Sequence, residues 1–269
     1  NYAYQGAGVF AHDTEGRISH SVFSGNEAEY GAAIFLDDDS HLLVVNNTIV
    51  DNAAGTNGGG IYADAGIASA LVNNVIAFAA DGEGLYAADA ARDTRLFLAF
   101  NDVYGNLDGE YGGGLDDPTG IWGNLSVDPA FVAFTPDGDP HDDDLTLDAL
   151  SALVDAGAID VPDDDGTRSD IGRYGGDLDG STAGANYVVS QLGDGDGDHV
   201  DDAARASPAD DAILVQPGEY RDAVDLRGQD ITLRSPLRPD ATTLRGRSNG
   251  TQLDRAGADD AQLEHVDVR

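Results

Sequence analysis

The most suggestive chemistry in the sequence is a run of alternating carboxylates at residues 193 to 202, Gly-Asp-Gly-Asp-Gly-Asp-His-Val-Asp-Asp. This spacing lets a tight loop surround a Ca²⁺ ion with several oxygen atoms. The run departs from the EF-hand pattern, because His199 stands where that loop needs Gly and Arg205 where it needs a bidentate Glu. A Ca²⁺ site and a plain polar loop therefore both stay open. The candidate ligands are Asp194, Asp196, Asp198 and Asp202.

Two histidines have acidic neighbours in the sequence and are the best candidates for acid–base chemistry. His41 follows the cluster at residues 37 to 39, and His141 precedes the cluster at 142 to 144. A third acidic cluster lies at residues 163 to 165. Carboxylate pairs are so frequent in this composition that their presence says little about glycoside hydrolysis. We expect polar turns at all three clusters, with counterions near the charges, and no enzymatic activity.

Composition narrows the classes of partner. The 269 residues carry 50 Asp and Glu against 14 basic residues, a formal charge of -36. Such a surface repels a phosphate backbone, so nucleic acid is excluded as a partner. No apolar run approaches the roughly 20 residues of a membrane span. Asp far exceeds Glu and there are 35 Gly, which indicates a chain that turns often and is rarely helical.

The elements that position these residues repeat along the chain. Gly-led phrases place an aromatic residue at Phe10, Phe35, Tyr62 and Tyr86, at spacings of 25, 27 and 24 residues. A second column begins at residues 21, 47, 74 and 101, at spacings of 26, 27 and 27. Each period holds two or three short β-branched or alternating stretches separated by Gly, Asn and Asp, a pattern typical of short strands. Stacked coils of about 25 residues can bury one continuous core, which a single coil cannot do.

One polar column fits this stacking. Asn47, Asn74 and Asn101 recur at the repeat spacing. In stacked coils they would form a turn ladder, with each amide bonding to the next coil. Separate turns with no ladder are the alternative.

The coil phrases resemble those of the right-handed parallel β-helix repeat proteins of bacterial surfaces. The similar phrases are residues 21 to 28, residues 58 to 62, and the series from 123 through 151 to 176 that ends the β-helix in that family. Residues 187 to 235 resemble its entry coils. The resemblance implies an all-β, right-handed parallel β-helix with one short capping helix near residues 200–206. The same fold hosts pectate lyases and polygalacturonases, so it does not decide activity. The Asn-Thr-Asp, Gly-His-Gly and Arg-Ile-Lys signatures of polygalacturonases are absent, and no Lys is present to act as a lyase base.

The resemblance also predicts the organisation of the chain. Residues 1–135 are the C-terminal coils of one β-helix, and 136–176 are its closing segment. Residues 177–186 form a linker, and 187–269 hold the capping helix and first coils of a following β-helix. Read tail to head, residues 263 to 269 followed by 1 to 10 form an uninterrupted passage of the family. Tandem repeats in one long chain, separate subunits that stack end to end, and circular permutation all fit this order.

We therefore predict an extracellular or cell-surface structural protein, a fibre or surface-layer component that assembles with copies of itself by head-to-tail continuation of the β-helix. The acidic loop is a possible Ca²⁺ staple at the junction. The predicted assembly residues are Tyr2, Tyr4, Val9, Phe10, Leu263, Val266 and Val268. A carbohydrate-binding adhesin that recognises surface glycans through an exposed aromatic row is an alternative. A polysaccharide lyase or hydrolase with a catalytic groove is a further one.

Overall fold

The structure is a computed structural model. It describes residues 1–38, 40–64, 67–88, 95–158, 161–176, 185–189, 199–206, 212–215, 218–220, 224–225, 231–234, 242–244, 253–254, 262–264 and 267–268. The chain forms two compact units, Asn1–Asp177 and Leu178–Arg269. Each unit is described by itself.

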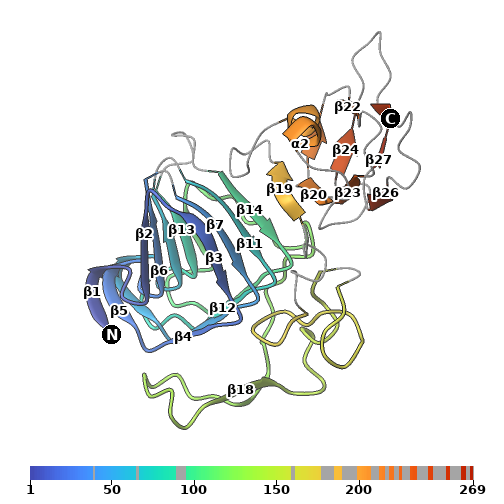
Figure 1. Cartoon of the computed structure of the whole chain (residues 1–269). Coiled ribbons are helices and arrows are strands. Elements are labelled where there is room, and N and C mark those ends of the chain that lie inside the picture. Colours follow the sequence, from blue (N-terminus) through green and yellow to red (C-terminus); the bar gives the residue numbers. More distant parts are fainter. Residues whose placement is uncertain are drawn as a thin grey trace. The chain divides into compact units, whose positions relative to one another are not determined.

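The first unit is a stack of coils with up to four short strands each (Figure 1). The first coil holds β1 (Tyr2–Gln5), β2 (Val9–His12), β3 (Glu15–Ser19) and β4 (Val22–Ser24). The second holds β5 (Glu27–Tyr30), β6 (Ile34–Asp37), β7 (His41–Val45) and β8 (Thr48–Val50). The third holds β9 (Ala53–Asn57), β10 (Ile61–Ala63), β11 (Ala68–Val72) and β12 (Val75–Ala77). β13 (Leu85–Ala87), β14 (Arg95–Ala99) and β15 (Asp102–Tyr104) follow, and then β16 (Tyr111–Gly113).

Equivalent strands of successive coils pair in parallel and build four sheets. Their orders are β1-β5-β9, β16-β13-β10-β6-β2, β14-β11-β7-β3 and β15-β12-β8-β4. The register follows the sequence repeat, so that Val9 pairs with Ile34, Ile34 with Ile61, and Ile61 with Leu85. These side chains face the main apolar core, in which Ile34 and Ile61 are completely buried. The prediction of an all-β parallel β-helix is confirmed.

The predicted asparagine ladder is also confirmed, and it is longer than predicted. The amide of Asn47 donates to Oδ1 of Asn74 at 3.0 Å, and that of Asn74 donates to Oδ1 of Asn101 at 2.9 Å. Asn101 continues the ladder to Asn124 at 3.1 Å. Each of these side chains is buried. The ladder therefore supplies partners for polar groups that the coil stack removes from water.

A second ladder runs along the opposite end of the fourth sheet. Asn1 donates to Asn26 at 3.1 Å, and Asn26 donates to Asn52 at 2.8 Å. In the next coil Ala79 interrupts the amide column, but its backbone N–H donates to Oδ1 of Asn106 at 3.0 Å. The turns that lead from the first sheet to the second contain a residue in the left-handed backbone conformation, as at Gly58 with a φ of 68°. A Cβ at Gly58 would lie 2.8 Å from the carbonyl oxygen of Ile61, so the turn requires glycine.

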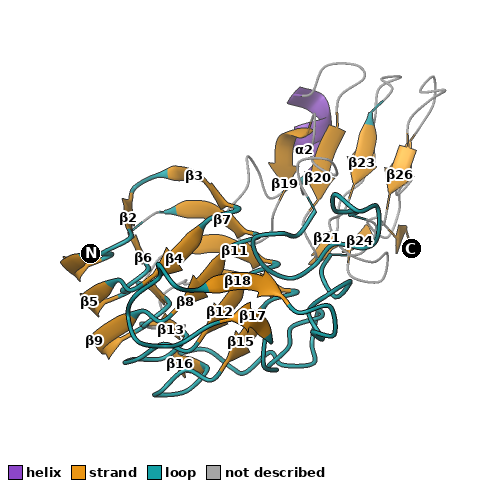
Figure 2. Cartoon of the chain, turned by 90° about the horizontal axis from the view of Figure 1, so that it is seen from below, coloured by secondary structure: helices purple, strands orange, loops and turns teal. Residues whose placement is uncertain are grey.

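Residues 126–176 do not repeat, and they cover the outer face of the sheet β4-β8-β12-β15. They include the antiparallel pair β17 (Phe131–Ala133) and β18 (Asp144–Leu147), seen in Figure 2. Leu145, Leu153 and Ile171 form a second apolar cluster with Val50 and Val75 of that sheet. This segment gives the solenoid a second, separate core.

The second unit is a smaller set of parallel coils. Its sheets are β19-β20-β23-β26, β21-β24-β27 and β22-β25. The strands of the first sheet are β19 (Ala185–Val189), β20 (Ala212–Val215), β23 (Thr232–Arg234) and β26 (Gln262–Glu264). The others are β21 (Gly218–Tyr220), β24 (Thr242–Leu244), β27 (Asp267–Val268), β22 (Val224–Asp225) and β25 (Leu253–Asp254). The short helix α2 (Val200–Ala206) packs against β19, β20 and β22 and buries Val200, Ala203 and Ala204 in the core. The short helix predicted near residues 200–206 is therefore present.

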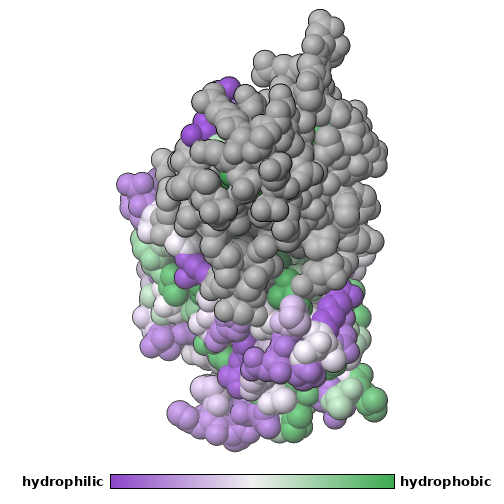
Figure 3. Space-filling view, turned by 45° about the vertical axis from the view of Figure 1, so that its right-hand side comes forward, coloured by the Kyte–Doolittle hydropathy of each residue, from purple (hydrophilic) through white to green (hydrophobic). Residues whose placement is uncertain are grey.

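The surface reflects the acidic composition. Where Figure 3 shows described residues, hydrophilic side chains are interspersed with smaller apolar areas. Among the described residues, no helix has the length and apolar character that a membrane crossing requires.

Candidate functional site

The four parallel sheets of the first unit all end on the same coil. Among the described strands, β1, β2, β3 and β4 are each terminal in a sheet, and each pairs with one other strand, β5, β6, β7 and β8 respectively. The far side of each strand therefore presents backbone N–H and C=O groups in the geometry that another strand can pair with. We call the coil formed by β1 to β4 the head edge.

The apolar core is open at the head edge. Val9, Ile18 and Phe23 point into the main core from the first coil but are only partly buried. Their equivalents one coil further on, Ile34, Val44 and Ile49, are at most 1% exposed. An added coil would remove the apolar side chains of the first coil from water, at about 25 cal/mol per Å² buried.

An aromatic stack runs along the outer face of the second sheet and reaches the head edge. Phe10 and Phe35 stack at 5.6 Å, Phe35 and Tyr62 at 4.7 Å, and Tyr62 and Tyr86 at 5.2 Å, with interplanar angles of 9° to 19°. Phe35 is 1% exposed, whereas Phe10, the terminal ring, is 47% exposed. The four aromatic residues that the sequence repeat aligns thus form one continuous stack, and the terminal ring of this stack lies at the head edge.

The neighbouring sheet adds exposed tyrosines to the same edge. Tyr2 is 84% exposed and Tyr4 is 67% exposed on β1, and Tyr4 meets Tyr30 edge to face at 5.7 Å. Burial raises the pKa of Tyr62 to about 12, assisted by the nearby Asp64 carboxylate. The phenol of Tyr62 is therefore neutral at physiological pH.

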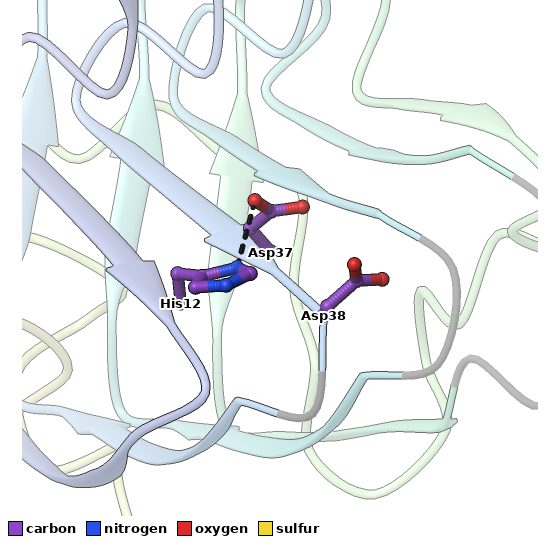
Figure 4. Close-up of side chains that lie close together, drawn as sticks. All are labelled: His12, Asp37 and Asp38. Carbon is purple, nitrogen blue, oxygen red and sulfur yellow. Dashed lines mark hydrogen bonds and ion pairs between the residues drawn. The ribbon is translucent and has the colours of Figure 1, made fainter.

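A cluster of histidine and aspartate side chains lies at the end of β2 and β6 (Figure 4). His12 Nδ1 is 3.1 Å from Asp37 Oδ2, and the possible ligand atoms of His12, Asp37 and Asp38 all lie within 4.8 Å of one another. The ring of His12 stacks on Phe10 at 6.4 Å. His12 and Asp38 are exposed, and Asp37 is partly buried.

Sequence reasoning missed this cluster because it paired the acidic residues with their sequence neighbour His41. The structure brings His12 to Asp37 from the preceding coil, 25 residues away. The sequence repeat could have predicted this pair. Phe10 and Phe35 are 25 residues apart and pair across the coils, so His12 and Asp37, two residues after each of them, pair as well. The side chain of His41, in β7, lies outside the described part of the chain.

The other predicted site residues are placed as follows. Asp194, Asp196, Asp198 and Val266 lie outside the described residues. Asp202 lies in α2, Leu263 in β26 and Val268 in β27, and their side chains are not described. Tyr2, Tyr4, Val9 and Phe10 all lie on the head edge. β26 and β27 are terminal strands of their sheets in the second unit.

Comparison with known proteins agrees with the coil geometry. Residues 1–116 match the family model described as a right handed beta helix region. The match and the stacked parallel coils support the right-handed β-helix repeat family and confirm the predicted fold class. No curated protein matched the chain, and no solved structure did.

Proposed function

We propose that this protein is a structural β-helix component of the cell surface or extracellular space that assembles by adding coils of another copy to its head edge. A surface, structural or binding role is consistent with the β-helix fold. The observation that carries the proposal is that all four sheets end on the first coil, with an incompletely buried core beneath it.

The second unit has the strands that this edge would need. β25, β26 and β27 are terminal in their sheets, and they belong to its last coils in chain order. Added to β1–β4, a last coil would continue the parallel β-helix with the same chain direction. Such a contact joins two different surfaces and repeats along a line, which produces a filament unless the rotation closes a ring.

Two features favour a coil over a different partner. The aromatic stack ends in the partly exposed Phe10 ring, and the second amide ladder ends at Asn1. Both features already propagate from coil to coil, so an added coil can extend each of them. The copies could be tandem repeats of one polypeptide or separate subunits.

The aromatic row also bears on the adhesin alternative. A sugar stacks on the face of an aromatic ring. From Phe35 to Tyr86 the ring faces cover one another at 4.7 to 5.2 Å. The row therefore offers mainly ring edges to solvent, which favours a packing role over glycan binding. We likewise propose that the chain is not an enzyme.

Assembly is tested by negative-stain microscopy of the purified chain together with its mass on a denaturing gel. We expect filaments. Dissociation to about 28 kDa, the mass of this chain, would identify separate subunits, and one very long polypeptide would identify tandem repeats.

Two charged variants locate the interface. Tyr4→Lys and Phe10→Lys place a charge on the head edge and should prevent assembly while the chain stays folded, because both side chains are already exposed. Leu150→Lys is the matched control, since Leu150 is 93% exposed on the closing segment. Monodisperse monomers of the parent chain, or filaments unaffected by both head-edge variants, would overturn the proposal.

A further inference from the structure

We propose that His12, Asp37 and Asp38 form a binding site for a first-row divalent transition-metal ion, for which Zn²⁺ is the probe. The site would link the first coil to the second. The proposal rests on the geometry of these three side chains and is independent of the assembly proposed above.

The backbone fixes two of the three ligands. His12 and Asp37 are directly paired residues of β2 and β6, so both side chains leave the sheet on the same face, one coil apart. In Figure 4 the imidazole is turned toward the Asp37 carboxylate, and Asp38 follows at the end of β6. Ser40 Oγ donates to the backbone carbonyl of Asp37 at 2.6 Å and holds the turn that carries Asp38.

The separations suit a metal ion. Ligand atoms about 2.1 Å from an ion lie about 3.0 Å apart in octahedral geometry and about 3.4 Å apart in tetrahedral geometry. His12 Nδ1 and Asp37 Oδ2 are 3.1 Å apart. The carboxylate of Asp38 has its oxygen within 4.8 Å of both atoms, and its exposure leaves the side chain free to rotate inward.

Asp38 differs from several aspartates in the turns of this chain. Asp117, Asp144 and Asp165 each accept a hydrogen bond from a backbone N–H two residues further on. Within the described residues, no donor to the Asp38 carboxylate is observed, and its neighbour Asp37 carries the same charge. A turn therefore does not account for Asp38, whereas a divalent cation shared with Asp37 would offset the repulsion between the two carboxylates.

The donor set selects the class of ion. One imidazole nitrogen with two carboxylates suits Zn²⁺ and its first-row neighbours. Ca²⁺ instead takes roughly six to eight oxygen ligands. Three protein ligands also leave coordination positions to water. Binding requires the free nitrogen lone pair, so the ion replaces the hydrogen bond between His12 and Asp37.

Isothermal titration of the full chain with Zn²⁺ tests the site, in physiological salt and excess Ca²⁺ to suppress diffuse binding by the acidic surface. We expect one saturable Zn²⁺ equivalent. His12→Ala and Asp38→Asn should each lower the Zn²⁺ affinity by at least about tenfold, as expected for the loss of a metal ligand. Asp13→Asn is the matched control for charge, because Asp13 is exposed beside His12 but outside the cluster. His141→Ala is the control for an exposed histidine among acidic residues.

Structural readouts complete the test. Zn²⁺ should shift the ring-proton resonances that disappear from the NMR spectrum of His12→Ala. It should also slow amide exchange in β2, because the ion ties this terminal strand to β6. The proposal is overturned if no saturable equivalent binds, or if the control variants lose binding as much as His12→Ala and Asp38→Asn. It is also overturned if the shifted ring protons belong to another histidine.

Discussion

The buried carboxyl of Asp102 predicts that this fold loses stability as the pH rises toward neutrality. Asp102 lies on β15 with no exposed surface, beneath the closing segment. Its Oδ1 accepts a hydrogen bond from the backbone N–H of Val127 at 2.9 Å, and its Oδ2 has no protein partner among the described residues. Burial raises the pKa of Asp102 from 3.8 to about 7, and the charges of Glu110 and Asp128 add to the rise.

The two pKa values of Asp102 determine how the free energy of unfolding changes with pH. Between pH 3.8 and about 7 the folded chain keeps a proton on Asp102 that the unfolded chain has lost. The free energy of unfolding therefore falls as the pH rises through this window and levels off above it. Across about 3 pH units, at about 1.4 kcal/mol per unit, the total loss is about 4 kcal/mol.

Asp102→Asn isolates this contribution. The amide oxygen can still accept the hydrogen bond from Val127, but the side chain cannot ionise. Urea unfolding followed by fluorescence of Trp122, the single tryptophan, gives the free energy of unfolding at pH 5 and pH 8. The carboxylates that do not interact with Asp102 titrate alike in both proteins and cancel in the difference. From pH 5 to pH 8 the variant should gain about 3 kcal/mol relative to the parent chain.

Asp144→Asn is the control. Hydrogen bonds from Thr146 lower the pKa of the exposed Asp144, so it stays ionised throughout this window. Its difference from the parent chain should not change between pH 5 and pH 8. Parallel pH profiles for Asp102→Asn and the parent chain would refute the reasoning, because they would show that Asp102 does not titrate near neutrality.

Four further predictions follow from the ladders, the stack and the proposed contacts. Asn74→Ala should lower the free energy of unfolding by about 3 kcal/mol or more, measured in urea, because it leaves several buried polar groups without partners. Tyr62→Ala should cost about 2 to 3 kcal/mol in the same assay by breaking the aromatic stack, whereas Tyr62→Phe should be nearly neutral. Deletion of residues 250 to 269 should abolish assembly in negative-stain images, and unchanged filaments would count against the head-to-tail contact. If residues 194 to 202 bind Ca²⁺, chelation should lower the Tm, and an unchanged Tm would exclude a stabilising ion there.

The repeating half of the fold could be predicted because its contacts join residues one period apart. Asn47, Asn74 and Asn101 recur every 27 residues from coil to coil, and the structure bonds them in that order. The ladder continues to Asn124 after only 23 residues, a change in spacing that the repeat does not predict. The same period placed His12 beside Asp37, but proximity in sequence drew attention to His41 instead.

The contacts of the non-repeating residues 126–176 could not be predicted, because this part of the chain has no period. Its bonds to the coils join residues far apart in the sequence, such as Asn73 to Ser169 across 96 residues. Asp102 illustrates the consequence. Asp102 begins a repeat strand like its equivalents in the other coils, and nothing in the repeat indicates a raised pKa. Its pKa is raised because the non-repeating residues that follow the coils bury it.

Turn formation accounts for many of the Asp residues between 117 and 167. A coil bonds its backbone to the coils on either side, whereas residues 117 to 167 are largely non-repeating and need other partners for their N–H groups. Seven aspartates there accept a hydrogen bond from the N–H two residues further on: Asp117, Asp128, Asp137, Asp139, Asp144, Asp148 and Asp165. The short Asp side chain closes such a turn readily. Much of the negative charge in this segment thus accompanies turn formation, so acid richness alone does not indicate a cation site. Asp38 makes a stronger candidate because its carboxylate closes no such turn in the described structure and has an oxygen within 4.8 Å of an imidazole nitrogen.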